Sequence, residues 1–436
     1  MSHAAAQRRP LADHVADAST LLASVLEPVT VPLGAACVGR TALAPRRARV
    51  DVPSADNSQM DGFAVRAADL ASSDETTLAQ GELIAAGDAP GALPAGTARP
   101  IMTGAPLPEG ADCVIPIEET VTGQFDLAAR SVQLRPAEAS VGRFVRVRGS
   151  DTAAGDTILR PGDALTPGRI AHLAACGISD VEISAPLRVV VVSTGSEVTG
   201  PGEQLPAGGA FDANGPGLAA ALTAAGADVV AVERVADDAR ALVDRIRAAV
   251  RAHDARLVVT SGGVSRGTVE AVRLAAELPG VQLSFTSLAI QPGGPQGIGR
   301  IDVNDADGTD ASDAGDATNA GAARGSGIPW IALPGNPVSA LLSCELIVRP
   351  ALGAPARTRL RLPLALDAPE SSPAHLEQYR RARVLPSGTV RLVGGPSSHL
   401  IGGFARADAL VRIPVGTDRL ADGDLVETIL LPGGER

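Results

Sequence analysis

The most informative absence in this chain is lysine: all 38 basic residues among its 436 residues are arginine. Every positive charge is therefore a planar guanidinium that stays protonated and whose N–H donors match the geometry of oxyanions. Positive charge is also outnumbered, because 49 acidic residues give a net charge of −11. That balance argues against a general surface for nucleic acid or for acidic membrane lipids.

Cysteine is scarce and widely spaced. Only Cys37, Cys113, Cys176 and Cys344 occur, and no two of them form a C-x-x-C pair. This spacing is typical of reduced thiols in a cytoplasmic protein and not of a zinc site or a disulfide framework. Long apolar runs are absent as well: no stretch reaches the roughly 18 residues of a membrane span, and no signal peptide is evident near the N-terminus.

Aromatic residues make up only 2% of the chain, although hydrophobic residues make up 45%. The cores must therefore be built mainly from alanine, valine and leucine. The length is sufficient for about three or four domains.

Strand-like and helix-like segments alternate in the middle of the chain. Apolar runs predict strands, and amphipathic segments between them predict helices at 215–226 and 238–252. The strands are expected at 187–193, 228–233, 256–260 and 329–333. Alternation of this kind predicts a parallel, doubly wound α/β sheet.

The remaining sequence is typical of β structure. Short apolar runs separated by Gly and Pro at 51–142 predict a β-rich inserted domain, and alternating runs after about 353 predict a small β-barrel-like domain. The predicted fold class is thus α/β plus β, in several domains. Their expected bounds are 1–27 and 169–352 for the α/β domain, 28–50 and 143–168 for an extended linker domain, 51–142 for the inserted domain, and 353–436 for the C-terminal domain, with a disordered insertion at 303–327.

Two loops follow predicted strands and predict a ligand site. Ser261–Ser265 and Pro334–Ala340 each begin with small residues and run into a helix-compatible segment. Open α/β sheets bind ligands beyond the carboxyl ends of their strands, where glycine lets a ligand approach the backbone and a helix N-terminus favours anions. The alternative is an ordinary strand-to-helix turn.

Eight motifs in order along the chain resemble those of the molybdopterin molybdenumtransferase family, the MoeA type that includes the gephyrin E domain. They lie at 56–66, 101–106, 148–151, 193–197, 211–214, 261–265, 334–340 and 397–399. Such a series on suitable elements is far more specific than any one motif.

The resemblance implies an enzyme that inserts molybdate into adenylated molybdopterin with Mg²⁺ and releases AMP. It also implies a homodimer, and a possible partner in the adenylyltransferase that makes the substrate. Mg²⁺ takes oxygen ligands and keeps several waters, so one or two carboxylates suffice to hold it. By resemblance, Glu197 and Glu270 are the metal ligands.

Further site residues follow from the same resemblance. The catalytic set is Asp61, Thr103, Glu197, Asp237, Asp238 and Glu270, of which Asp61 and Thr103 act across the homodimer interface. The substrate-binding set is Thr194, Gly195, Asp212, Asn214, Ser261, Gly262, Gly263, Val264, Ser265, Arg266, Pro334, Gly335, Asn336, Pro337, Ser339, Ser398 and His399. For Asp237 and Asp238 an alternative remains, because both lie where a helix N-cap belongs.

Three positions depart from the family pattern. Glu270 stands where the family has aspartate, and Gln291 and Gly294 stand where it has lysines that serve the anionic ligand. Arg266 is a candidate replacement for the missing charge. The departures leave a second interpretation open, a paralogue that binds molybdopterin or a partner enzyme as a scaffold.

Overall fold

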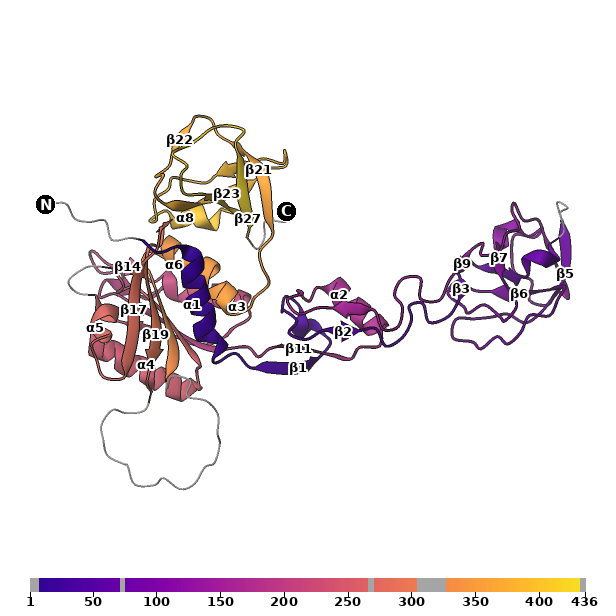
Figure 1. Cartoon of the computed structure of the whole chain (residues 1–436), viewed down its shortest axis with the longest axis horizontal. Coiled ribbons are helices and arrows are strands. Elements are labelled where there is room, and N and C mark those ends of the chain that lie inside the picture. Colours follow the sequence, from indigo (N-terminus) through magenta and orange to yellow (C-terminus); the bar gives the residue numbers. More distant parts are fainter. Residues whose placement is uncertain (1–7, 71–74, 266–269, 304–326, 432–436) are drawn as a thin grey trace, which may run out of the picture. The chain divides into compact units, whose positions relative to one another are not determined.

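The computed structural model describes residues 8–70, 75–265, 270–303 and 327–431 (Figure 1). The chain forms two compact units: the first comprises 1–29, 39–41 and 184–436, and the second comprises 30–38 and 42–183. Within the described ranges, no helix is both long enough and apolar enough to cross a membrane. The predicted insertion at 303–327 lies almost wholly outside the described residues.

The centre of the first unit is a six-stranded sheet. Its order is β15 (Asp228–Val235), β12 (Arg188–Thr194), β16 (Leu257–Ser261), β20 (Ile328–Leu333), β19 (Pro295–Ile301) and β17 (Val281–Ser287). The first four strands are parallel, as predicted, whereas β19 and β17 add an antiparallel edge that the apolar pattern did not indicate.

Helices cover both faces of this sheet. On one face lie α1 (Leu11–Ala23), α3 (Asn214–Ala224) and α6 (Pro337–Ser343), and on the other lie α4 (Ala239–His253) and α5 (Ala271–Ala275). Alternate residues of β12 enter the two cores, with Val189 and Val191 on one side and Val190 and Val192 on the other. A buried parallel strand faces apolar groups on both sides, which explains its unbroken valine run.

The strand order reverses next to β12. From β12 the chain passes through α3 to β15 on one side, and then through α4 to β16 on the other side. The loops that follow β12 and β16 therefore diverge at the carboxyl edge of the sheet. Such a switch point is where open α/β sheets bind ligands.

The C-terminal part of the first unit is a closed five-stranded barrel, as predicted. Strand β23 pairs with both of its neighbours β24 and β25, which closes the ring. The barrel strands are β21 (Arg359–Ala365), β23 (Glu377–Val384), β24 (Val390–Leu392), β25 (Ala409–Ile413) and β27 (Leu425–Leu430). Shorter elements of this part are β22 (Glu370–Ser371), β26 (Arg419–Leu420), α8 (Ile401–Ala405) and, before the barrel, the π-helix η4 (Cys344–Val348) with α7 (Arg349–Ala351).

The barrel shares a core with the α/β sheet. Tyr379, Leu410 and Ile429 pack in one apolar cluster with Leu288 and Leu333 of the α/β part. Strand β18 (Ile290–Gln291) also pairs with β23, and Gln378 Nε2 donates to Gln291 Oε1 at 2.6 Å. The barrel is thus an integral part of the first unit.

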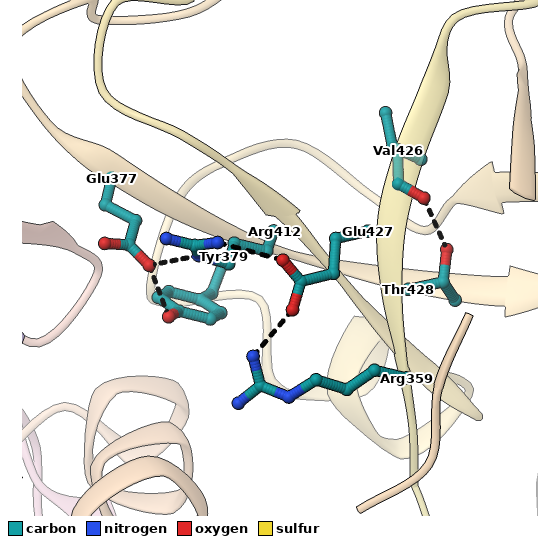
Figure 2. A network of polar contacts seen from close by, with 7 residues as sticks. All are labelled: Arg359, Glu377, Tyr379, Arg412, Val426, Glu427 and Thr428. Carbon is teal, nitrogen blue, oxygen red and sulfur yellow. Dashed lines mark hydrogen bonds and ion pairs between the residues drawn. The ribbon is translucent and has the colours of Figure 1, made fainter. Parts of the chain in front are cut away.

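A polar network joins four barrel strands (Figure 2). Arg412 donates to Glu377 at 2.6 Å and to Glu427 at 2.9 Å, and Arg359 donates to the other oxygen of Glu427 at 2.6 Å. The Tyr379 hydroxyl donates to Glu377, and burial together with this bond raises the pKa of Tyr379. Each carboxylate therefore has a charged partner, as half-buried charges require.

The second unit contains the predicted β-rich domain. Its five-stranded sheet has the order β7 (Cys113–Pro116), β4 (Gly62–Val65), β6 (Thr97–Ile101), β5 (Thr76–Gln80) and β8 (Ser131–Leu134). Short 3₁₀ helices occur at Ala35–Cys37, Ala67–Asp69 and Ile117–Glu119. Pairs of short strands make up the rest: β1 (Pro28–Pro32) with β11 (Asp180–Ser184), β2 (Arg46–Arg47) with β10 (Thr157–Leu159), and β3 (Asn57–Ser58) with β9 (Val145–Arg146).

One predicted domain boundary is displaced. The sequence placed 169–183 in the α/β domain, but these residues belong to the second unit. They hold α2 (Pro167–Ala175), whose neighbour is β10, and most of β11, which pairs with β1. Their pairing partners lie earlier in the chain, which periodicity within 169–183 does not reveal.

The antiparallel edge of the sheet depends on Gly299. A Cβ at this position would lie 1.7 Å from the carbonyl oxygen of Gln282 on β17. Gly299→Ala is therefore expected to lower the free energy of unfolding by about 1–3 kcal/mol, because the strands must separate to admit the methyl group. Gly168→Ala is the control, since its Cβ would meet no atom within 4 Å. Equal melting temperatures for the two variants in calorimetry would contradict this account.

Candidate functional site

A cavity of about 500 Å³ lies at the carboxyl edge of the parallel strands β12, β16 and β20. Strand ends and the loops after them form its wall. The lining residues are Ser193, Thr194, Gly195, Glu197, Val198, Ala210, Phe211, Asp212, Ala213, Asn214, Asp237, Gly262, Gly263, Ser265, Glu270, Gly335, Asn336 and Pro337. Both loops singled out in the sequence, at 261–265 and 334–340, thus contribute to one cavity.

Glycines allow these loops to approach one another. A Cβ on Gly262, whose φ is +101°, would lie 2.4 Å from Thr194 Oγ1. A Cβ on Gly335 would lie 3.1 Å from the Cα of Gly262. The loops after three parallel strands therefore meet backbone against backbone, which only residues without a side chain permit.

Asp212 serves mainly to hold the site together. Its side chain is 8% exposed, and Oδ1 accepts hydrogen bonds from Ser193 Oγ at 3.0 Å, Asn214 N at 3.0 Å and Gly215 N at 2.9 Å. Two of these donors are backbone amides in the first turn of α3, which no carbonyl within the helix satisfies. Asp212 therefore ties β12 to the start of α3.

Asp237 and Asp238 have different roles, although they are adjacent. Asp237 Oδ2 accepts from Ser196 N at 3.0 Å, and Asp237 N donates to Ser196 Oγ at 3.1 Å, so the loops after β12 and β15 are joined by two bonds. Asp238 Oδ1 accepts from Ala241 N at 2.9 Å. The N-cap alternative is therefore correct for Asp238, which does not line the cavity.

Glu197 and Glu270 are the acids in the cavity that are left without partners. Among the described residues, neither carboxylate has a hydrogen bond or an ion pair, and no basic residue contributes to the described lining. Glu270 directly precedes α5 but caps no amide there. Both carboxylates line the cavity without a partner, which leaves them available to a ligand there.

This donor set fits Mg²⁺. No group of three or more His, Cys, Asp or Glu side chains that could enclose a metal ion occurs in the described ranges. Mg²⁺ does not need such a group, since it commonly binds one or two carboxylates and retains water molecules. Glu197 and Glu270 satisfy that requirement.

The cavity also contains an unsatisfied acceptor. Asn214 Nδ2 donates to the carbonyl oxygen of Gly335 at 2.7 Å, but its Oδ1 is buried and has no partner. Asn336 is satisfied in contrast, because its Oδ1 accepts from Val338 N at 3.2 Å and caps α6. A buried acceptor without a partner is costly, and Asn214 retains this cost beside the cavity.

Several predicted residues lie outside the cavity wall. Ser261 is buried, with its hydroxyl bonded to the carbonyl oxygen of Pro334 at 3.1 Å, and Val264 and Ser339 are also buried. Ser398 and His399 precede α8 in the C-terminal part and do not line the cavity; His399 Nδ1 pairs with Ser397 Oγ at 2.7 Å. Arg266 lies outside the described residues.

Asp61 and Thr103 are brought together in the second unit. The amide and the hydroxyl of Thr103 both bond to Asp61 Oδ1, at 2.7 and 2.9 Å, and both residues are exposed. Next to them a Cβ on Gly62 would lie 2.1 Å from the carbonyl oxygen of Ile115. The pair thus rests on a sheet that tolerates only glycine at this contact.

Sequence reasoning missed five lining residues. Ser193, Val198, Ala210, Phe211 and Ala213 were not predicted as site residues. Three of them belong to two short strands that pair with each other, β13 (Val198–Thr199) and β14 (Ala210–Phe211). The available signal was Phe211 itself, a rare aromatic residue beside the Asp212–Asn214 motif.

The fold and the cavity define a class: a multidomain protein whose α/β domain has an acidic cavity at the switch point of its sheet. Family models match nearly the whole length of the chain. The MoeA N-terminal region (domain I and II) matches 9–177, the probable molybdopterin binding domain matches 190–354, and the MoeA C-terminal region (domain IV) matches 363–431.

Individual relatives agree with the family models. The Mycobacterium tuberculosis protein molybdopterin molybdenumtransferase 2 is 38% identical over 416 residues, which cover 91% of this chain and 93% of the relative. A molybdopterin molybdenumtransferase of Synechococcus elongatus is 32% identical, covering 86% and 88%. A crystal structure of the molybdopterin biosynthesis MoeA protein from Pyrococcus horikoshii superposes with a TM-score of 0.70 at 27% identity, covering 98% of this chain and 100% of that one. The chain belongs to the molybdopterin molybdenumtransferase family.

The acids of the cavity should differ in their effect on stability. Asp212→Ala removes three hydrogen bonds and is expected to cost about 1–2 kcal/mol of unfolding free energy, because Ser193 and the first turn of α3 lose their acceptor. Glu270→Gln removes an unpartnered charge and should leave stability unchanged or slightly higher. Urea unfolding of both variants tests this difference. A loss of stability for Glu270→Gln as large as that for Asp212→Ala would assign Glu270 a structural role instead.

Proposed function

We propose that this protein inserts molybdenum into adenylated molybdopterin and releases AMP, with molybdate as co-substrate and Mg²⁺ as cofactor. Membership of the family supports the reaction. The observation that carries the proposal for this chain is the pair of unpartnered carboxylates, Glu197 and Glu270, in the cavity at the switch point of the sheet.

The acidic lining of the cavity supports a role for a divalent cation with this substrate. A phosphoanhydride is anionic, and the described wall offers it carboxylates without a compensating guanidinium. Glu197 and Glu270 would hold Mg²⁺. The bound ion would neutralise negative charge on the phosphoanhydride as it is cleaved. Without that cation, the carboxylates of the wall would repel an anionic ligand.

The protein's own groups bind and orient the substrate around these two acids. Gly262 and Gly263 leave their backbone open to close approach, since no side chain covers it. Ser196 and Asp237 fix the loop that carries Glu197, and Asp212 fixes the turn that carries Asn214. Asn214 in turn joins the start of α3 to the loop after β20, because its Nδ2 donates to the carbonyl oxygen of Gly335.

Glu270, Gln291 and Gly294 differ from the family pattern, and under this proposal the difference at Glu270 changes the rate of the reaction and not its type. Glu270 is one methylene longer than the aspartate of the family pattern, and a small misplacement of a catalytic group costs up to about a hundredfold in rate. Gln291 is bonded to Gln378 of the barrel, and Gly294 is buried. Both residues therefore contribute to packing in this chain.

The proposal extends to assembly and location. A homodimer, with Asp61 and Thr103 in catalytic roles, is proposed from the family resemblance, and Thr103 donates two hydrogen bonds to Asp61 within the chain. The adenylyltransferase that makes the substrate is a proposed partner. The four cysteines are free and buried, which supports a reducing, cytoplasmic location.

Release of AMP tests the reaction. Purified protein with adenylated molybdopterin, molybdate and Mg²⁺ is expected to release AMP in step with formation of active cofactor, and removal of Mg²⁺ with a chelator should stop the release. Glu270→Gln should lower the rate by about a hundredfold or more, because the charge that holds the cation is lost. Chromatography of the nucleotide measures the rate.

The control for this experiment is Asp244→Asn. Asp244 is an exposed acid of α4 outside the cavity wall, so its loss should leave AMP release unchanged. Tight binding of the adenylated substrate by the wild-type protein without AMP release would reject the insertase and support the scaffold interpretation.

A further inference from the structure

The eight aromatic residues of this chain, six Phe, one Tyr and one Trp, all lie in described ranges, and seven of them are packed. Trp330, Phe63 and Tyr379 are buried. Phe125 packs on Phe63, Phe144 and Phe285 lie under arginine guanidinium groups, and Phe404 packs against the apolar core. Phe211 is the exception, because it is 48% exposed and no aromatic or guanidinium group in the described part of the chain packs on its ring.

Phe211 is part of the cavity wall. It lies there with other apolar side chains, among them Val198 and Pro337, whereas Glu197 and Glu270 supply the acidic part. An isolated exposed phenylalanine on an open surface needs no explanation. An exposed ring that lines a ligand cavity, in a chain with so few aromatic residues, indicates a contact with the ligand.

The backbone on both sides of Phe211 is fixed. Ala210 N donates to the carbonyl oxygen of Glu197 at 2.9 Å, and Asp212 N donates to that of Thr199 at 2.8 Å. The Asp212 side chain is held by three further bonds. The backbone that carries the ring is therefore held in place, and it loses little conformational entropy when a ligand packs against the ring.

We propose that Phe211 is the stacking platform for a flat nitrogen heterocycle of the ligand. The inference rests on the proposed function, since adenylated molybdopterin carries two such rings, a pterin and an adenine. Both rings present an apolar face and an exocyclic amino group at one edge. The carboxylates of Glu197 and Glu270 in the same cavity are acceptors that suit such an amino donor.

Binding of the separate rings tests the platform without any turnover. The full-length protein is titrated calorimetrically with AMP and, separately, with 6-hydroxymethylpterin, in buffer that contains Mg²⁺. Phe211→Ala and Phe211→Leu are expected to weaken binding of the stacked ring about tenfold, which corresponds to about 1.4 kcal/mol. Phe211→Tyr keeps the aromatic face and should restore the wild-type affinity.

The two titrations identify which ring is stacked, because only the affinity for that ring should fall. Val415→Ala is the control: Val415 is 58% exposed in the C-terminal part and lies outside the cavity wall. Its binding should equal that of the wild type. Thermal unfolding of each variant verifies that the fold is intact.

Wild-type affinity in Phe211→Leu would overturn stacking, and failure of the wild-type protein to bind either ring would overturn the proposal altogether. A change of oligomeric state in Phe211→Ala with unchanged ring binding would show that the exposed ring contacts a second copy instead. Ring binding that depends on Phe211 in a protein that releases no AMP would retain the platform while rejecting the insertase.

Discussion

The close backbone contact among three loops at the carboxyl edge of the sheet governs the rest of the site. Gly262 lies against Thr194 on one side and Gly335 on the other, so close that a methyl group on either glycine would clash. Because the loops are joined there, Asn214 reaches the carbonyl oxygen of Gly335, and the ends of β12, β16 and β20 surround one cavity. A bulkier residue at this contact would separate the loops and open the wall.

The acids around the cavity divide into two groups by their partners. Asp212, Asp237 and Asp238 are engaged by backbone amides and hydroxyls, so their charge is used to hold strand ends and helix starts in place. Glu197 and Glu270 have no such partner among the described residues, so their charge is not used to hold the fold and remains available to a ligand of the cavity. Aspartate, with its short side chain, bonds the nearby backbone; the longer glutamates extend beyond it.

The sequence predicts the parallel strands well because a strand buried on both faces requires an unbroken apolar run, as at Val189–Val192. It does not predict β17 and β19, and in β19 Gly297 and Gly299 interrupt the apolar pattern because they let the adjacent strands approach. In the site, the motifs identify the loops that line the cavity, but they do not identify which residues of each loop face it. Ser261 and Val264 belong to a motif and yet are buried in the packing, and Asp238, assigned by resemblance, caps α4 instead. Phe211 lines the cavity through the pairing of two short strands.

The shared core of the barrel and the α/β sheet limits how this architecture can change. Leu288 and Ile290 are covered by a cluster that includes Tyr379, Leu410 and Ile429. A chain that lost the barrel would expose these apolar side chains, together with the unpaired edge of β18, to water. The α/β part of this protein is therefore not a detachable module: any shorter descendant would need a new polar surface in place of the barrel.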